Sequence, residues 1–409
     1  MKRRWLILAD DLTGAADCAI AFAKHGMDAV VSWGAAAPAT TQVLSVDADS
    51  RRFPAKEAAA RQIVALTTHW QPGMRLYKKI DSTLRGQPMA ELAVQLRALE
   101  VDGRRAPLAV VAPAFPATGR VTLGGRILVG DLPLEQTPLW ARDHTYSSAH
   151  LGEALASAGL TSVVIDLDVI RRGVEAVHAR LLSVLVDRVD AVVCDCTAAA
   201  DLAIVAEASL RLDQVVWVGS AGLATALAEQ VAPETRGHRR LTPPRGPVLT
   251  VVGSLAEASR LQARVLADAG LVRHILVAPA TLEAGPVDPA WKEAQLALAG
   301  GVVDGVDMLL EIALAPDPDL SRGPALAGRL AALVEPVAPN LGGLVATGGD
   351  TACALLSQLG VKGIRLIDEV EPGVPLGLTQ GAQVVPVVTK AGAFGDAGTL
   401  RRCLERLKS

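Results

Sequence analysis

Short runs of consecutive apolar residues recur along the chain, and alanine-rich stretches of helical character separate them. Apolar residues at consecutive positions are typical of parallel strands that are buried on both faces. The candidate strands are Trp5–Ala9, Ala29–Ser32, Val43–Val46, Leu76–Ile80, Leu108–Ala112, Ser162–Asp166, Ala191–Cys194, Val215–Val218, Val248–Val252, His274–Ala278, Met308–Ile312, Gly343–Ala346, Ile364–Ile367 and Val384–Val388. Regular alternation of such strands with helices predicts an α/β fold of mostly parallel sheets covered by helices.

Composition supports this interpretation and excludes one class of partner. The 409 residues include only four Phe, two Tyr and six Trp, so the core must be built mainly from aliphatic side chains. The same scarcity disfavours proteins that stack aromatic rings on single-stranded nucleic acid. With 40 Lys and Arg against 43 Asp and Glu, the chain also lacks the basic surplus of nucleic-acid binders. We therefore expect no nucleic-acid partner.

A polar, proline-rich segment without periodicity, residues 233–247, is typical of a linker. It predicts an N-terminal domain over residues 1–232 and a C-terminal domain over residues 248–409. Each domain is long enough for its own core and is expected to be a mostly parallel sheet covered by helices. A homodimer is the default expectation for assembly, since dimers are the commonest soluble oligomers.

The beginning of the chain does not predict export. The basic residues 1–4 are followed by an apolar run from Trp5 to Ala9 only, which is too short for a signal peptide. No run of about 20 apolar residues occurs, so we expect no membrane partner. The five cysteines lack the spacing of a zinc site and are expected to be reduced, buried thiols. These features predict a cytoplasmic protein.

In open α/β sheets, ligands bind beyond the carboxyl ends of the strands, so residues that directly follow strands are candidates for a site. Asp10 and Asp11 follow the first strand and open a helix together with Thr13 and Gly14. Two adjacent carboxylates need cations, a metal or backbone N–H groups to stay charged. The alternative is that Asp11 or Thr13 only caps the helix, but one cap explains only one of these groups.

A second group of polar residues ends another candidate strand. It places Lys79, Asp81, Ser82 and Arg85 within a few positions of one another. Cations and hydroxyl donors that converge from one loop suit an anionic substrate. A solvated turn with a serine or threonine cap is the alternative. Arg51, after the third strand, is a further candidate anion contact, although the pair that it forms with its neighbour is also typical of ordinary surface charge.

A glycine-bearing loop at residues 113–126 has a different interpretation. Gly119 and Gly124 have the spacing of a phosphate loop, but Gly125 and Arg126 stand where lysine and serine or threonine are required. This segment is interpreted either as a shaped loop beside the site or as a plain connection.

Three further glycine-bearing loops follow candidate strands in the C-terminal half, at residues 252–254, 347–351 and 390–396. Glycine lets backbone N–H groups approach a phosphate, and a helix N-terminus favours its negative charge. Three such loops in one domain indicate a nucleotide site. No G-x-G-x-x-G follows the first strand of either half, which disfavours a dinucleotide-binding dehydrogenase.

Together, these segments resemble the four-carbon acid sugar kinases over nearly the whole chain, from Leu6 to about Leu404. The motifs that carry the resemblance are ADDLTGAAD (9–17), KKIDSTLRG (78–86), VGS (252–254), TGGDTA (347–352) and TKAGAFGD (389–396). Leu12 stands where many members have Phe, Asp350 where some have Glu, and Ala393 where many have a second Gly. None of these departures removes a charged or hydroxyl group from the expected site.

The resemblance implies an N-terminal domain that binds the sugar acid, a C-terminal domain that binds ATP, and an active site in the cleft between them. The implied reaction transfers the γ-phosphoryl group to the terminal hydroxyl of a tetronate, with D-threonate as the preferred acceptor. D-erythronate, L-threonate and a 3-oxo-tetronate are the alternatives. Mg²⁺ is expected to bridge the phosphate oxygens.

The predicted site residues follow from the motifs and the resemblance. The expected substrate contacts are Asp10, Asp11, Arg51, Lys79, Ile80, Asp81, Ser82 and Arg85. The expected nucleotide contacts are Ser254, Thr347, Gly348, Gly349, Asp350, Gly392 and Gly395. Asp10 or Asp81 is the predicted base for the attacking hydroxyl.

Two other classes of function remain open at this point. A hydroxy-acid dehydrogenase would need a nicotinamide fingerprint, which is not found, and NAD(P)H binding would test it. A non-catalytic binding protein for sugar acids would show no ligand-dependent release of ADP.

Overall fold

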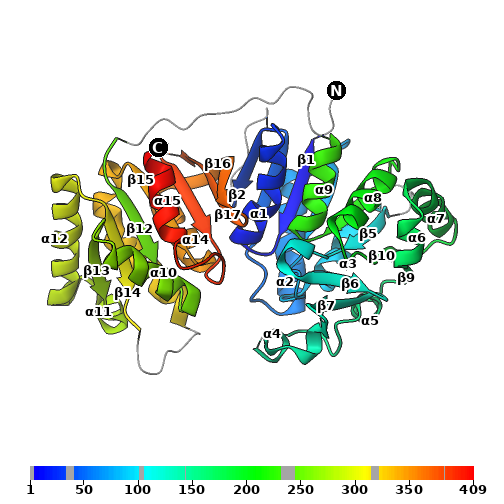
Figure 1. Ribbon diagram of the computed structural model, residues 1–409, viewed down its shortest axis with the longest axis horizontal. Coiled ribbons are helices and arrows are strands. Elements are labelled where there is room, and N and C mark those ends of the chain that lie inside the picture. Colours follow the sequence, from blue (N-terminus) through cyan, green and yellow to red (C-terminus); the bar gives the residue numbers. More distant parts are fainter. Residues whose placement is uncertain are drawn as a thin grey trace. The chain divides into compact units, whose positions relative to one another are not determined.

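The computed structural model describes residues 4–33, 41–100, 106–142, 144–231, 245–314, 322–381 and 383–409. The chain forms two compact units, Met1–Arg236 and Gly237–Ser409 (Figure 1). Most of the segment predicted as a linker, up to residue 244, lies outside the described residues. Both units alternate strands with helices, so the predicted two-domain α/β fold is confirmed.

The N-terminal unit is built on a sheet in which neighbouring strands run parallel. In sheet order the strands are β2 (Ala29–Ser32), β3 (Val43–Asp47), β1 (Trp5–Ala9), β4 (Arg75–Lys79), β11 (Val215–Gly219), β5 (Leu108–Ala112), β10 (Ala191–Cys194) and β9 (Ser162–Ile165). Because β3, β1 and β4 are neighbours, the segments that follow them meet at one edge of the sheet. This order is what brings the predicted substrate contacts together.

Helices cover this sheet on both faces, as its apolar strands require. On one face α1, α9, α8 and α7 pack in succession, and elsewhere α2 packs on α3 and α3 on α5 (Figure 1). Their bounds are α1 (Leu12–Lys24), α2 (Ala55–His69), α3 (Pro88–Ala98), α5 (Leu151–Ser157), α7 (Val174–Val186), α8 (Ala199–Leu210) and α9 (Ala221–Val231). The short helices α4 (Pro138–Arg142) and α6 (Leu167–Arg171) complete the unit. The core contains mostly Leu, Val, Ile and Ala, as the composition predicted.

A small antiparallel meander follows β5 and was not predicted. It contains β6 (Arg120–Leu123), β7 (Arg126–Val129) and β8 (Leu132–Pro133). The carboxylate of Asp195, which follows β10, accepts hydrogen bonds from the backbone N–H groups of Gly124 (2.7 Å) and Gly125 (2.9 Å). The loop at residues 113–126 is therefore partly strand, and a carboxylate from a distant strand fixes its turn.

The C-terminal unit has a mixed sheet. In sheet order the strands are β13 (Arg273–Val277), β14 (Met308–Ile312), β12 (Val248–Val252), β15 (Gly343–Thr347), β18 (Pro386–Lys390), β17 (Val374–Gly381) and β16 (Val361–Glu371). The strands from β13 to β18 run parallel, whereas β17 is antiparallel to both β18 and β16. Strand β17 was missed, because its glycine and proline residues do not form a continuous apolar run.

The helices of this unit also pack in groups. Helix α10 (Glu257–Asp268) packs on α15 (Thr399–Lys408), and α13 (Gly323–Val334) packs on α14 (Gly349–Gln358), α12 (Pro289–Asp304) and α11 (Pro279–Ala284). Valine and leucine side chains from the strands, together with α10 and α15, form a buried cluster.

Among the described residues, no cysteine forms a disulfide, and all of the cysteines except Cys353 are buried. None of the helices in the described part of the chain has the length and apolar character needed to cross a membrane.

Candidate functional site

Strand β1 ends at Ala9, and the next two residues are the carboxylates predicted to bind substrate. Asp10 is buried, whereas the Asp11 side chain is one-fifth exposed. Asp11 caps α1, since its Oδ1 accepts a hydrogen bond from the Gly14 N–H (2.9 Å) and its Oδ2 accepts one from the Thr13 hydroxyl (2.7 Å). Asp11 therefore caps the helix, whereas Asp10 takes no part in the cap.

Arg51 joins the two carboxylates. Its Nε and Nη2 donate to the two oxygens of Asp10, both at 2.8 Å. Its Nη1 and Nη2 donate to the two oxygens of Asp11, at 2.6 and 2.8 Å. One guanidinium therefore clamps both carboxylates in a bidentate manner, which gives short, charge-assisted and directionally fixed hydrogen bonds. An ordinary surface arginine, the alternative considered for Arg51, does not make such contacts.

The backbone after β3 positions Arg51 for this clamp. Strands β3 and β1 pair in parallel register, with Asp47 opposite Ala9. The N–H groups of Ser50 and Arg51 then donate to the Asp10 carbonyl, at 3.0 and 3.1 Å. Asp49 turns the chain with a positive φ of 46°. The loop after β3 is thus tied to the strand end that carries Asp10.

The electrostatics of the clamp keep Asp10 ionised. Burial alone would raise the pKa of the Asp10 carboxyl group, but the Arg51 guanidinium, with smaller contributions from Lys79 and Lys78, outweighs burial and lowers it. In turn, burial acts to lower the pKa of Arg51, and Asp10 and Asp11 raise it well above its ordinary value. Both partners are therefore charged at any physiological pH.

Lys79 approaches the same carboxylates from the end of β4. Its side chain is buried, and a Cβ atom placed on Gly14 would lie 2.8 Å from its Nζ and 2.5 Å from Asp11 Oδ1. Glycine at position 14 therefore allows α1 to pack against the ammonium group. Burial acts to lower the pKa of Lys79, but Cys18, Asp11 and Asp10 raise it above its usual value.

Asp81 and Arg85 form a second ion pair beside the first. Arg85 donates from Nη2 and Nε to the two Asp81 oxygens, at 2.9 and 3.0 Å. Burial acts to raise the pKa of Asp81, but Arg85, Arg51 and Lys79 hold it well below its ordinary value. Within the turn, Leu84 has a positive φ of 57°, which is rare for a bulky residue and is found mostly where a site imposes strain.

The turn also places Gly86 against the clamp, because a Cβ atom there would lie 3.0 Å from Asp10 Oδ2. Of the other two predicted substrate contacts, Ile80 belongs to the hydrophobic core, so only its backbone is available to a ligand. Ser82 is partly exposed. The structure thus brings the predicted substrate contacts together at the ends of β1, β3 and β4.

Arg120 was not predicted as a contact. It begins β6 and lies near enough to Asp81 and Arg85 for their charges to act on it, while burial lowers its pKa. Its Nε is buried and finds no hydrogen-bond partner among the described residues. The only signal in the sequence was its place in the loop expected beside the site.

Asp47 is the other residue that sequence reasoning missed. It ends β3 and is buried, and its Oδ1 accepts a hydrogen bond from the Asp49 N–H at 2.7 Å. Burial, reinforced by the charges of Asp11, Asp49 and Asp10, raises the pKa of Asp47 to about 8. A carboxyl group that is protonated near neutrality can donate a hydrogen bond in a site that is otherwise rich in acceptors.

This raised pKa predicts a specific pH dependence of stability. A carboxyl group whose folded pKa lies above its unfolded value stabilises the fold at low pH and loses that contribution as pH rises toward the folded pKa. We expect Asp47→Asn to match the parent protein near pH 4, close to the ordinary pKa of 3.8, and to melt at least about 3 °C higher near pH 9. Thermal unfolding followed by circular dichroism across this range measures the difference. A difference in melting temperature that does not change with pH would contradict the raised pKa.

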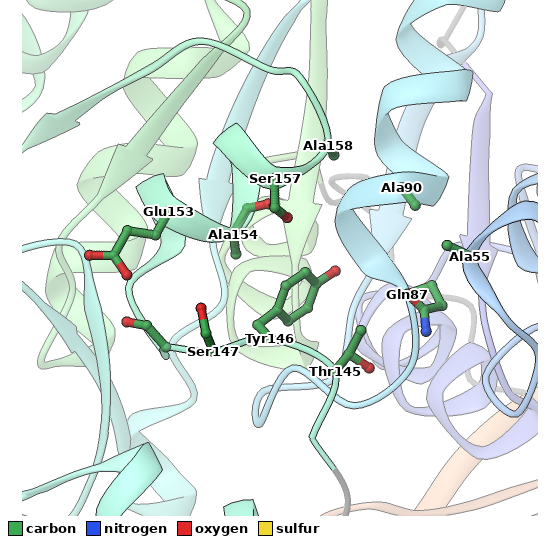
Figure 2. Close-up of a pocket in the computed structure, with 11 residues that line it drawn as sticks. Ala55, Gln87, Ala90, Thr145, Tyr146, Ser147, Glu153, Ala154, Ser157 and Ala158 are labelled. Atoms are coloured by element: carbon green, nitrogen blue, oxygen red, sulfur yellow. The ribbon is translucent and has the colours of Figure 1, made fainter.

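A pocket of about 240 Å³ lies in the same unit, lined in part by hydroxyl groups (Figure 2). Gln87 and Ala55 border it, and Tyr146 and Thr145 line it. The Thr145 hydroxyl donates to the Gly86 carbonyl at 2.5 Å. The Tyr146 hydroxyl accepts from the Met89 N–H at 3.1 Å. The wall of this pocket therefore braces the turn that packs against Asp10, although no predicted substrate contact lines it.

In the C-terminal unit, three of the predicted nucleotide loops meet. Ser254 follows β12, Gly348 follows β15 and Gly392 follows β18, and these strands are neighbours. A Cβ atom on Gly392 would lie 2.1 Å from Ser254 Oγ, and one on Gly348 would lie 3.4 Å from Ser254 Cβ. Glycine is required at Gly348 for a second reason, its φ of 98°.

The other predicted nucleotide contacts differ in their surroundings. Gly349 opens α14, whose N-cap makes no side-chain hydrogen bond, so its first N–H groups can serve an anion. Asp350 is exposed in the first turn of the helix. The Thr347 hydroxyl turns inward, 2.9 Å from that of Ser259. The atoms nearest to a Cβ placed on Gly395 belong to Thr399 and Glu371.

Within the described part of the chain, no group of three or more His, Cys, Asp or Glu side chains is arranged to hold a metal ion.

Comparisons with known proteins cover both units. A family model described as a sugar-binding N-terminal domain matches residues 5–227, and one described as a nucleotide-binding C-terminal domain matches residues 249–400. A D-threonate kinase of Cupriavidus necator is 42% identical, covering 97% of this chain and 96% of its own. A D-threonate kinase of Bordetella bronchiseptica is 37% identical, covering 98% and 97%. A 3-oxo-tetronate kinase of Methylobacterium radiotolerans is 31% identical, covering 98% of both chains.

A crystal structure of a Salmonella typhimurium LT2 protein superposes with a TM-score of 0.81 at 23% identity, covering 98% of both chains. At this level of identity the likeness shows a shared fold and nothing finer.

Proposed function

Since the chain belongs to the four-carbon acid sugar kinase family, we propose that it transfers the γ-phosphoryl group of ATP to the terminal hydroxyl of a four-carbon sugar acid, with D-threonate as acceptor and 4-phospho-D-threonate as product. The observation that carries the proposal is full-length similarity, at 42% identity, to a D-threonate kinase. The 3-oxo-tetronate and D-erythronate kinases among the relatives are less similar, at 31% and 30%.

The charged residues at the ends of β1, β3 and β4 suit a small monoanionic acid. Asp10, Asp11 and Asp81 are balanced by Arg51, Lys79 and Arg85. Arg120 adds a cation next to Asp81. In our proposal Arg51 and Lys79 contact the acid while holding the two carboxylates in place, and Arg85 and Arg120 add positive charge for its carboxylate group. In our proposal the oxygens of Asp10 and Asp11 accept hydrogen bonds from its hydroxyls, and the Ser82 hydroxyl donates to or accepts from them.

In the transfer step, the substrate oxygen forms a bond to the γ-phosphorus, the bond between that phosphorus and the bridging oxygen of ADP breaks, and the hydroxyl proton passes to a carboxylate. Asp10 and Asp81 stay our candidates for that carboxylate. Both have lowered pKa values and are therefore weak bases. Phosphoryl transfer through a loose transition state chiefly requires a correctly oriented substrate hydroxyl group. A clamped carboxylate can orient that hydroxyl group.

The loops around Ser254, Gly348 and Gly392 would hold the phosphates of ATP through backbone N–H groups and the N-terminus of α14. Mg²⁺ would neutralise phosphate charge. Mg²⁺ is usually held by one or two carboxylates together with substrate phosphates, so in our proposal the ion enters bound to ATP. The homodimer, the cytoplasmic location and the domain limits stay predictions.

The proposal is tested by measuring ADP release with ATP and Mg²⁺ and a panel of four-carbon acids: D-threonate, D-erythronate, L-threonate and a 3-oxo-tetronate. We expect D-threonate to give the highest kcat/KM, exceeding the other acids by at least about tenfold, because a misplaced hydroxyl leaves buried polar groups unpaired. Phosphorus NMR of the product should show a monoester on the terminal carbon.

Omission of the acid is the control for background ATP hydrolysis. A lack of turnover with every acid would contradict the kinase assignment. Preference for another acid of the panel would contradict only the choice of substrate.

A further inference from the structure

Lys390 is a buried lysine that the proposed mechanism has not yet used. It is the last residue of β18, its side chain is 1% exposed, and it lies opposite Thr347 in the neighbouring strand β15. A lysine is almost never fully buried without a partner for its charge. Its surroundings therefore need an explanation.

The ammonium group of Lys390 is held by oxygens from three segments. Its Nζ donates to Thr347 Oγ1 at 3.2 Å, and lies 3.5 Å from both Ser259 Oγ and the Gly392 carbonyl oxygen. The Ser259 hydroxyl also donates to the Gly392 carbonyl, at 2.7 Å. The lysine thus links the end of β15, the first turns of α10 and the loop after β18.

These segments are the ones that carry the proposed nucleotide contacts. The Gly348 N–H donates to the Lys390 carbonyl at 2.9 Å. Gly392, which lies two residues after Lys390 in the sequence, packs against Ser254. A displacement of the ammonium group would therefore disturb the loops after β15 and β18 together.

Among the described residues, no carboxylate oxygen lies within hydrogen-bond distance of Lys390 Nζ. The oxygens within hydrogen-bond reach of Nζ are two hydroxyls and a carbonyl. Of the titratable groups that face it, Glu371 on β16 is engaged by Arg402 (2.8 Å) and by the Thr399 hydroxyl (2.5 Å). The other, Cys403 on α15, is a buried thiol whose pKa burial raises to about 12, so it is neutral.

We propose that Lys390 is the positioning cation of the nucleotide site: its ammonium group fixes the loops after β15 and β18, and the phosphates of a bound nucleotide balance its charge. The proposal rests on the proposed function, because it takes the occupant of these loops to be ATP. A polyanion at the loops supplies the opposite charge that no carboxylate within hydrogen-bond distance provides, and it does so where little water competes.

The proposal predicts that nucleotide binding is linked to the uptake of a proton by Lys390. Burial lowers the pKa of Lys390 to about 8 in the free protein. Phosphates that favour the charged form must raise this pKa in the complex, so binding takes up a proton above about pH 8. Affinity should then be constant below about pH 8 and fall by up to about tenfold per unit above it. Adenosine, which carries no phosphate, should not show this slope.

The test measures the Kd of a non-hydrolysable ATP analogue and of adenosine by calorimetry on the full chain, between about pH 6.5 and about 9.5. Lys390→Met should weaken binding of the analogue at least about tenfold near pH 7 and remove the slope. Lys390→Arg, which stays charged throughout, should keep the affinity and lose the slope. Lys292→Met, on an exposed part of α12, is the matched control and should behave as the parent protein.

Binding of D-threonate and the melting temperature show whether the variants are folded. A weaker affinity of Lys390→Met with the parent slope would assign the lysine to packing alone and overturn the proposal, as would an unchanged Kd. A parent chain that binds the analogue without any slope would overturn this proposal and leave the kinase assignment intact. A parent chain that binds no nucleotide at any pH would overturn both.

Discussion

Asp10→Asn is expected to lower kcat for ATP-dependent phosphorylation by about a thousandfold while leaving nucleotide affinity within about twofold of the parent. The substitution keeps the volume of the side chain but removes its charge. Both Asp10 oxygens accept hydrogen bonds from Arg51, and an amide nitrogen at one of these positions would meet an N–H donor. The clamp would lose its orientation, and a hydroxyl held by Asp10 would lose its acceptor.

The measurement is the steady-state rate of ADP release at saturating D-threonate, together with calorimetry of the ATP analogue. Asp187→Asn, at the exposed end of α7 in the same unit, is the matched control and should keep full activity. If Asp10→Asn turned over at the parent rate, Asp10 would be neither the base nor an orienting acceptor. A parallel loss of nucleotide affinity would point to misfolding of the whole chain.

Gly392→Val is expected to produce the opposite pattern, with a loss of nucleotide affinity of about a hundredfold and little change in D-threonate binding. A Cβ atom at this position lies 2.1 Å from Ser254 Oγ, 3.1 Å from Ser254 Cβ and 3.3 Å from Ala256 Cβ. Rotation of the Ser254 side chain can move its Oγ but not its Cβ, so the loops after β12 and β18 must separate. Nucleotide contacts on both loops would then lose their common geometry.

Gly328→Val is the matched control, because Gly328 is exposed in α13 with nothing within 4 Å of its Cβ position. Calorimetry of D-threonate and of the ATP analogue with both variants shows separately how each substitution affects acid binding and nucleotide binding. Equal weakening of acid and nucleotide binding by Gly392→Val would show a general loss of structure. Unchanged nucleotide affinity would remove Gly392 from the site.

Much of the fold could be predicted because buried parallel strands leave a local signal. Strands β1, β2, β5, β10, β12 and β14 have the bounds predicted from their apolar runs, and the remaining predicted strands differ mainly at their ends. The predictions failed where that signal is weak. Strand β17 is interrupted by proline and glycine, and the meander β6–β8 has short, partly exposed strands. Such strands depend on pairing with partners more than on their own composition.

The residues of the candidate site also fall into those that the sequence reveals and those that it does not. Residues next to one another in a motif, such as Asp10 and Asp11, could be identified because their spacing alone requires an explanation. Asp47 could not, and Lys390 was identified only as part of a glycine-bearing loop, because what distinguishes both residues is burial among residues from other segments. The sequence contains the same aspartate or lysine whether the side chain is solvated or buried in the folded protein.

By itself, the sequence determined the α/β class, the division into two parts and the chemistry of the strand-end motifs, because these depend on residues close together in the chain. Only the tertiary structure decided that Arg51 clamps Asp10 and Asp11, about 40 positions away, and that Lys390 meets Ser259 and Thr347. The physical reason is that hydrogen-bond geometry and the desolvation of charge are set by neighbours in space. Strand order, and not spacing along the chain, selects those neighbours.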